Sequence, residues 1–120
     1  MIEPIPGLPD NVLGLRASGK VTVEDYEQVI EPALEEAKAR LGKFRVLFQL
    51  TPEFEGYTAG AAFDDAKVGM KHLTSFDRVA LISDVDWVNS AVKMFGFAVP
   101  CPVKVFPNAE LEAARAWIVE

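Results

Sequence analysis

The chain has 120 residues, of which half are apolar and a quarter charged, with a single cysteine and a net charge of −6. This length predicts one domain, residues 1–120, and one cysteine cannot form an internal disulfide. The acidic excess disfavours partners such as nucleic acid and anionic membrane surfaces, because both are bound by clustered Lys and Arg.

The first part of the chain predicts a β-hairpin. Residues 2–5 form a short strand, and Pro4 favours an edge position because proline cannot donate to a strand ladder. A Gly- and Pro-containing turn over residues 7–11 reverses the chain. Residues 12–19 then form the second strand.

A long helix is predicted next, from Thr22 to Leu41. Thr22 and Asp25 match a capping box, in which a hydroxyl and a carboxylate bind free backbone N–H groups. Apolar residues then recur at helical spacing until Gly42. Pro32 lies inside this segment, where a proline costs ~3 kcal/mol. The sequence leaves open one bent helix or two helices over 22–31 and 33–41.

Strands and helices alternate along the remainder. The predicted elements are a buried strand at 45–50, a loop at 51–57, a helix from Thr58, a buried strand at 79–83, a helix from Asp84 or Asp86 to Gly96, a strand at 103–106, and a last helix capped by Asn108. Alternation of this kind predicts an α/β fold with a largely parallel sheet.

Residues that could carry chemistry are sparse. His72 and Cys101 lie about thirty residues apart in separate elements, so we expect no metal site, and no cofactor. A protonated His72 would favour the helix C-terminus, and Cys101, between two prolines, has no neighbour that activates a thiol. Asp84 and Asp86 follow a strand end where α/β sheets often carry chemistry, but N-capping explains them more simply.

The two common nucleotide-binding motifs are absent from the sequence: neither the dinucleotide-binding glycine pattern nor the phosphate-binding loop occurs. No segment is apolar enough to span a bilayer, and no signal peptide is recognised. We therefore expect a cytoplasmic protein without a transmembrane segment.

Two segments retain functional interest. The loop before the second helix carries Phe54, Glu55, Tyr57 and Thr58. The hydroxyl of Thr58 could be a modification site at a helix N-terminus or simply an N-cap. The segment 94–100 is unusually apolar for a connection. If exposed, Met94, Phe95, Phe97 and Val99 would form a ligand or homodimer surface, and if buried they would belong to the core.

Residues spaced along the whole chain resemble the small bacterial SpoIIAA-like proteins. They are 19–26, Pro32, 54–57, 79–82, Trp87, 106–110 and 114–118. The resemblance implies the fold of STAS domains and anti-sigma-factor antagonists: a four- to five-stranded, mostly parallel sheet with about four helices mainly on one face, similar in shape to CRAL-TRIO lipid-binding domains. Those antagonists carry a phosphorylated serine in an Asp-Ser-Gly-like sequence, and Thr58 is the hydroxyl in the comparable place, without the Asp-Ser pair.

Three functional hypotheses follow. The first is a non-enzymatic STAS-like regulatory or protein-binding domain that acts through the helix from Thr58 and the segment before it. The second is a carrier or sensor of a small apolar, lipid-like ligand, suggested by the aromatic residues and the CRAL-TRIO likeness. The third is an enzyme using His72, Asp84 and Asp86, which requires these side chains to converge.

Overall fold

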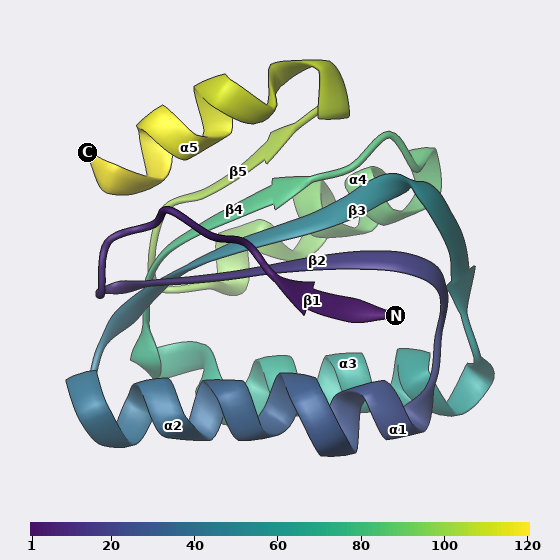
Figure 1. The fold of residues 1–120 in the computed structure, drawn as a ribbon, viewed down its shortest axis with the longest axis horizontal. Helices are drawn as coiled ribbons and strands as arrows, with labels where there is room; N and C mark the ends of the chain where they lie inside the picture. The colour runs from purple at the N-terminus through teal and green to yellow at the C-terminus, as the bar shows by residue number, and fades with distance from the viewer.

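The elements of the fold follow the predicted order β-β-α-β-α-β-α-β-α (Figure 1). The structure is a computed structural model. It describes the backbone of residues 1–120 and the side chains of all residues except Phe63, Asp65, Ala66, Gly69, Met70, Phe95 and Phe97.

Five strands form one sheet in the order β1-β2-β3-β4-β5. They are β1 (Ile2–Pro4), β2 (Val12–Val21), β3 (Phe44–Tyr57), β4 (Phe76–Ile82) and β5 (Val103–Phe106). β1 is antiparallel to β2, and all other pairs are parallel. The hairpin, the edge position of Pro4 and the mostly parallel sheet are therefore confirmed.

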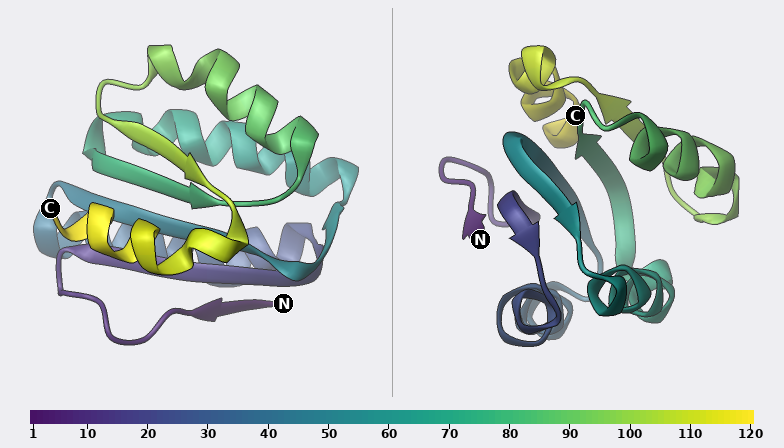
Figure 2. Two further views of the ribbon diagram at one scale, coloured as in Figure 1. Left: turned by 90° about the horizontal axis from the view of Figure 1, so that it is seen from above. Right: turned by 90° about the vertical axis from the view of Figure 1, so that its right-hand side faces the viewer.

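The strand order explains where the helices lie. Successive parallel strands advance in one direction across the sheet, and right-handed crossovers then place every connecting helix on the same face. These helices are α1 (Val23–Asp25) with its continuation α2 (Glu31–Leu41), α3 (Ala59–His72) and α4 (Asp86–Phe95). The last helix, α5 (Leu111–Val119), has no further strand to reach and covers the other face (Figure 2).

Two arginines fix α5 on that face. Arg45 of β3 donates to the carbonyl of Ile118 at 2.8 Å, and Arg78 of β4 donates to that of Trp117 at 2.8 Å. The last carbonyls of a helix have no partners within the helix, so these bonds both satisfy them and anchor its C-terminus.

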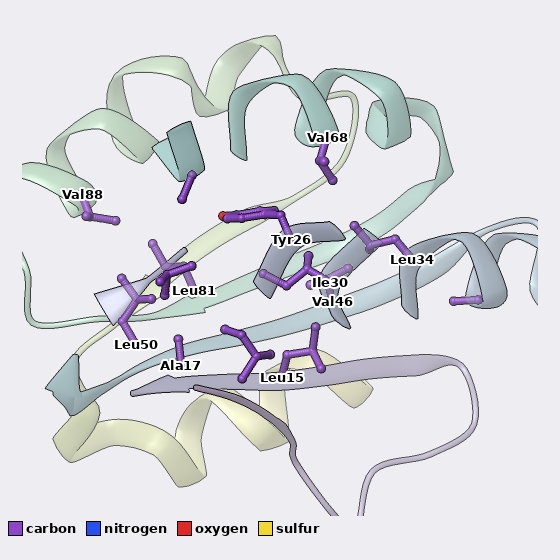
Figure 3. Packing of buried hydrophobic residues seen from close by; sticks show 14 of the residues in the cluster. Leu15, Ala17, Tyr26, Ile30, Leu34, Val46, Leu50, Val68, Leu81 and Val88 are labelled. Atoms are coloured by element: carbon purple, nitrogen blue, oxygen red, sulfur yellow. The ribbon is translucent and has the colours of Figure 1, made fainter. Parts of the chain in front are cut away.

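The sheet separates two cores, because side chains alternate between faces along each strand. Val46 and Leu50 pack under α1 to α4, whereas Leu47 and Ile82 pack against α5. Tyr26 lies within the larger core, surrounded by aliphatic side chains (Figure 3). The doubly covered strands explain the continuous apolar runs in the sequence.

Pro32 does not divide the first helix. The N-terminal capping box of Thr22 and Asp25 forms as predicted, and the helix ends at Gly42, which has φ +76°. A π-helical turn, Tyr26–Ile30, lies directly before α2 and places Pro32 in its first turn. In the π-helical turn the N–H of Glu31 bonds to the carbonyl of Tyr26, so the hydrogen-bond register shifts directly before Pro32, which has no N–H to donate, and the helix continues without a break.

The predicted loop at 51–57 is wrong, because these residues extend β3 to Tyr57. Two irregularities made the strand difficult to recognise. Residues 51–53 lie opposite Ser18 alone, and Glu55 is an extra residue between the pairs Gly19–Phe54 and Lys20–Gly56. Gly19 and Gly56 have positive φ values, which glycine adopts without strain.

The predicted caps of α4 and α5 are also wrong. Asp84 instead accepts hydrogen bonds from the backbone and side chain of Asn108, at 3.1 and 3.0 Å. The Asn108 amide also donates to the carbonyl of Leu50 at 2.9 Å and accepts from Gln49 at 2.8 Å. Asn108 thus joins the ends of β3, β4 and β5, and these contacts use the groups that would otherwise cap a helix.

Among the described residues, no helix combines the length and apolar character needed to cross a membrane.

Candidate functional site

An apolar cavity of about 200 Å³ lies between the sheet and the helices of the larger core. Its floor includes Leu15, Val46 and Leu81 from three neighbouring strands, and its described lining is hydrocarbon or aromatic throughout. Among the described lining residues, Tyr26 and Tyr57 are the two whose side chains carry a polar atom. Polar sites hold water, whereas an engineered apolar cavity of ~150 Å³ stays dry and binds benzene.

An aromatic row borders this cavity near the end of β3. The ring centroids of Phe54 and Tyr57 are 5.2 Å apart, and those of Tyr57 and Trp87 are 6.3 Å apart, both with edge-to-face geometry. Trp87, in the first turn of α4, is 60% exposed. The row therefore extends from the core to solvent.

A second hollow of about 130 Å³ lies beside Trp87. It shares Tyr57, Val88 and Val92 with the cavity. The two hollows therefore adjoin at these side chains.

The irregular end of β3 creates this row. Phe54 and Tyr57 are three residues apart and would face opposite sides of a regular strand. The extra residue Glu55 resets the alternation, so both rings pack against the larger core. Glu55 itself is exposed.

Thr58 is the N-cap of α3. Its hydroxyl oxygen accepts a hydrogen bond from the backbone N–H of Ala61 at 3.2 Å, and its own N–H donates to Val21 at 2.9 Å. The Thr58 hydroxyl therefore caps the helix, which is one of the two interpretations given in the sequence analysis. Whether Thr58 is also modified stays a prediction.

The predicted apolar surface at 94–99 is described in part. Met94 is 63% exposed on α4, and Val99 is half-buried after the helix. The side chains of Phe95 and Phe97 lie outside the described residues. The neighbouring Lys93 contributes to a hollow of about 400 Å³ between α4 and β5.

The proposed acid and base groups do not converge. His72 ends α3 before β4, and Asp84 and Asp86 follow β4. The seven residues of β4 separate the two positions, which is about 23 Å at 3.3 Å per residue. The enzyme hypothesis based on these three residues therefore lacks its geometric requirement.

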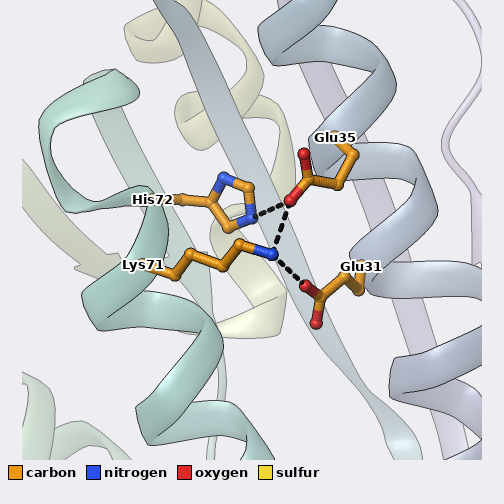
Figure 4. A network of polar contacts seen from close by, with 4 residues as sticks. All are labelled: Glu31, Glu35, Lys71 and His72. Atoms are coloured by element: carbon orange, nitrogen blue, oxygen red, sulfur yellow. Dashed lines mark hydrogen bonds and ion pairs between the residues drawn. The ribbon is translucent and has the colours of Figure 1, made fainter.

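His72 instead belongs to a polar cluster between α2 and α3 (Figure 4). Lys71 Nζ lies 2.8 Å from Glu31 Oε1 and 2.8 Å from Glu35 Oε1, and His72 Nε2 lies 3.5 Å from Glu35 Oε1. The hydrogen bond from Lys71 lowers the pKa of Glu35, and burial lowers the pKa of His72 despite this carboxylate. Burial of the ring therefore opposes the imidazolium form considered in the sequence analysis at this helix C-terminus.

Cys101 is partly buried and unpaired. Burial raises the pKa of its thiol, and the nearby Asp77 raises it further. Because the thiolate is the nucleophile, this environment suppresses reactivity, in line with the expectation that no neighbouring group activates the thiol.

The comparison with known families agrees with this architecture. The model of the SpoIIAA-like family matches residues 12–119. The chain belongs to the SpoIIAA-like family. The predicted resemblance and its fold are therefore confirmed, and the SpoIIAA-like fold is typical of regulatory STAS domains that are generally non-enzymatic.

A solved structure supports the same membership. An uncharacterised protein from Shewanella loihica PV-4 with a SpoIIAA-like fold has 33% sequence identity and a TM-score of 0.78, and the match covers 98% of this chain and 92% of that one. No curated protein matches the chain significantly. The comparisons therefore assign this SpoIIAA-like domain a family and a fold.

Proposed function

We propose that this SpoIIAA-like domain is a non-enzymatic binding domain that holds a small apolar or amphipathic molecule between its sheet and helices. The observation that carries this proposal is the cavity of about 200 Å³ with its apolar described lining. A molecule placed there exchanges water contacts for hydrocarbon contacts, and it gains roughly 25 cal/mol per Å² of apolar surface buried.

The cavity volume limits the size of the ligand. An apolar cavity of ~150 Å³ accepts benzene, so about 200 Å³ suits one ring with a short substituent, or a short acyl segment. About ten non-hydrogen atoms at ~0.5 kcal/mol each give a Kd on the order of 0.1–1 mM. A ligand with a polar end could bind more tightly by leaving that end beside Tyr57 or Trp87.

The position of Val88 gives a direct test. Val88 is buried on α4 and lines both hollows, so Val88→Phe places a ring where they meet. Titration with 4-fluorotoluene, followed by ¹⁹F NMR, should show saturable binding to the wild type. We expect Val88→Phe to weaken it by about tenfold or more, because the added ring occupies ligand volume.

A matched control lies two residues away. Ser90 is exposed on the same helix, so Ser90→Phe adds an aromatic ring without filling the cavity and should leave binding unchanged. Native mass spectrometry of freshly purified wild-type protein adds an independent readout, a retained small molecule. Failure of the wild type to bind 4-fluorotoluene saturably, together with a bare polypeptide mass, would reject the proposal.

Protein binding is the second candidate function, favoured by the outer face of α4. Trp87 and Met94 are both exposed, and their seven-residue spacing places them on one side of the helix. A second copy of the chain is the occupant to test first, since a homodimer surface over the segment 94–99, which includes Met94, is considered in the sequence analysis. Light scattering should give a dimer mass for the wild type and a monomer mass for Trp87→Glu/Met94→Glu, and a monomeric wild type would exclude this occupant.

A further inference from the structure

The cluster between α2 and α3 has the composition of a metal site. Glu31 and Glu35 are four residues apart on α2, so both carboxylates lie on one side of that helix. His72 approaches them from the end of α3 (Figure 4). Oxygen and imidazole ligands of this kind suit divalent first-row metals.

His72 supplies the observation that points to a ligand. Its side chain is 0% exposed, and neither ring nitrogen has a hydrogen-bond partner among the described residues. Buried polar atoms without partners are rare in folded proteins and call for an explanation. Nε2 faces the carboxylates, with Glu35 Oε1 at 3.5 Å, beyond the usual length of an N–H···O bond.

We propose that Glu31, Glu35 and His72 bind a divalent first-row metal ion such as Zn²⁺, and that the Lys71 ammonium takes the place of the ion when it is absent. The ligand atoms of these three residues all lie within 4.8 Å of one another. A point equidistant from three atoms at that maximum spacing is about 2.8 Å from each, and Zn–O and Zn–N bonds are about 2.0–2.2 Å. Each ligand therefore needs an inward shift of less than about 1 Å.

Lys71 acts as a competitor for the site. Its ammonium lies 2.8 Å from both carboxylates, and its side chain is 54% exposed. The ammonium can therefore move into solvent while both carboxylates turn to the metal. Lys38 also carries a positive charge that acts on Glu35 and His72, so the site binds the ion against two nearby cations.

Metal coordination requires a free nitrogen lone pair, and Nε2 of the buried, unpartnered His72 ring is available to present one toward the carboxylates. With three protein ligands, the ion keeps at least one position for water, the arrangement of an open site.

Metal binding would link α2 and α3, two helices that also line the cavity. Leu34 of α2 and Val68 of α3 line the cavity, and the proposed ligands lie on the same two helices. An ion would therefore hold α2 and α3 together along one wall. The metal site stands on its own geometry and does not depend on an occupant of the cavity.

The test uses tag-free, full-length protein treated with a chelator and then titrated with Co²⁺. Calorimetry and the visible absorption of bound Co²⁺ should both give one site per chain. Glu31→Gln and Glu35→Gln should each weaken binding by about tenfold or more, the size of effect seen even for residues that support metal ligands. Lys71→Gln should strengthen binding by about tenfold, because the competing ammonium is gone.

Glu36 provides the matched control. It is the neighbour of Glu35 but pairs with Arg40 at 2.9 Å instead of joining the cluster, so Glu36→Gln should leave Co²⁺ affinity unchanged. Zn²⁺ titration followed by NMR should shift the ring resonances of His72, which tests this ligand without a substitution in the core. The proposal would be overturned if neither the wild type nor Lys71→Gln binds Co²⁺ saturably. It would also be overturned if Glu36→Gln and Glu35→Gln lose the same Co²⁺ affinity, or if the His72 resonances stay unshifted at saturation.

Discussion

Substitution of Asn108 by alanine tests whether this side chain joins the strand ends or caps α5. Alanine removes three side-chain hydrogen bonds, to Gln49, Leu50 and Asp84. Gln49 is buried and would be left without a partner, at a cost of about 1–3 kcal/mol, and the Leu50 carbonyl would lose about 1 kcal/mol. Asp84 is exposed, so water replaces its lost bond at little cost.

The free energy of unfolding should therefore fall by about 2–4 kcal/mol, well above the ~1 kcal/mol typical of a lost N-cap. For a domain of this size the melting temperature should fall by about 6–20 °C. Urea denaturation can follow the fluorescence of Trp117, whose ring centroid lies 6.0 Å from that of Phe106. A loss below about 1 kcal/mol would indicate that the network contributes no more than a cap.

A second variant isolates the buried amide. Replacing both partners by apolar groups removes the unpaired donor, so Gln49→Leu/Asn108→Ala should be more stable than Asn108→Ala alone. The double-mutant cycle then gives a coupling energy above ~0.5 kcal/mol. Additive losses in this cycle would refute the argument that an unsatisfied Gln49 is the main cost.

Three further outcomes follow from single side chains. Leu47→Ala should lower the free energy of unfolding by about 3–4 kcal/mol in urea titrations, because Leu47 is fully buried in the core beneath α5. Thr22→Ala should cost about 1 kcal/mol in the same assay, and Thr22→Ser should restore most of it, since the hydroxyl caps the N–H of Asp25 at 3.3 Å. Alkylation of Cys101, followed by mass spectrometry, should be slower at pH 7–8 than that of a free cysteine, because burial, and then Asp77, raise the pKa of the thiol. The rate of alkylation should increase at higher pH, and Asp77→Asn should increase it as well.

Local sequence signals predicted the elements of this fold well. The capping box at Thr22 and the stop at Gly42 involve residues close in sequence, so their chemistry is visible in the sequence itself. The order of strands and helices and the largely parallel sheet follow from apolar patterning and from the alternation of elements, and the family resemblance implied helices mainly on one face. The structure confirms each of these predictions.

The errors arose where distant residues decide the outcome. Asn108 and Asp84 have the composition of helix caps, but they bind each other across 24 positions. The end of β3 contains Pro52 and Gly56, which are typical of loops, yet pairing with β2 extends the strand through them. Propensity therefore failed where tertiary hydrogen bonds compensate for it.

The candidate site was predicted in fragments. Phe54 and Tyr57 were identified, but their packing with Trp87 depends on the extra residue in β3. The cluster around His72 escaped prediction because its carboxylates come from α2, about forty positions earlier than Lys71. The one available signal was the spacing of Glu31 and Glu35, which places two carboxylates on one helix side.

The two edge strands of the sheet, β1 and β5, affect how copies of this chain can associate. β1 has three residues and contains Pro4, and β5 has four residues with Lys104 among them and prolines at positions 102 and 107. Short edge strands that carry lysine or proline are poor templates for another chain to pair with. Such edges protect the sheet from intermolecular β-pairing and aggregation, so copies of this chain should meet through side chains on their helices and not through a shared sheet.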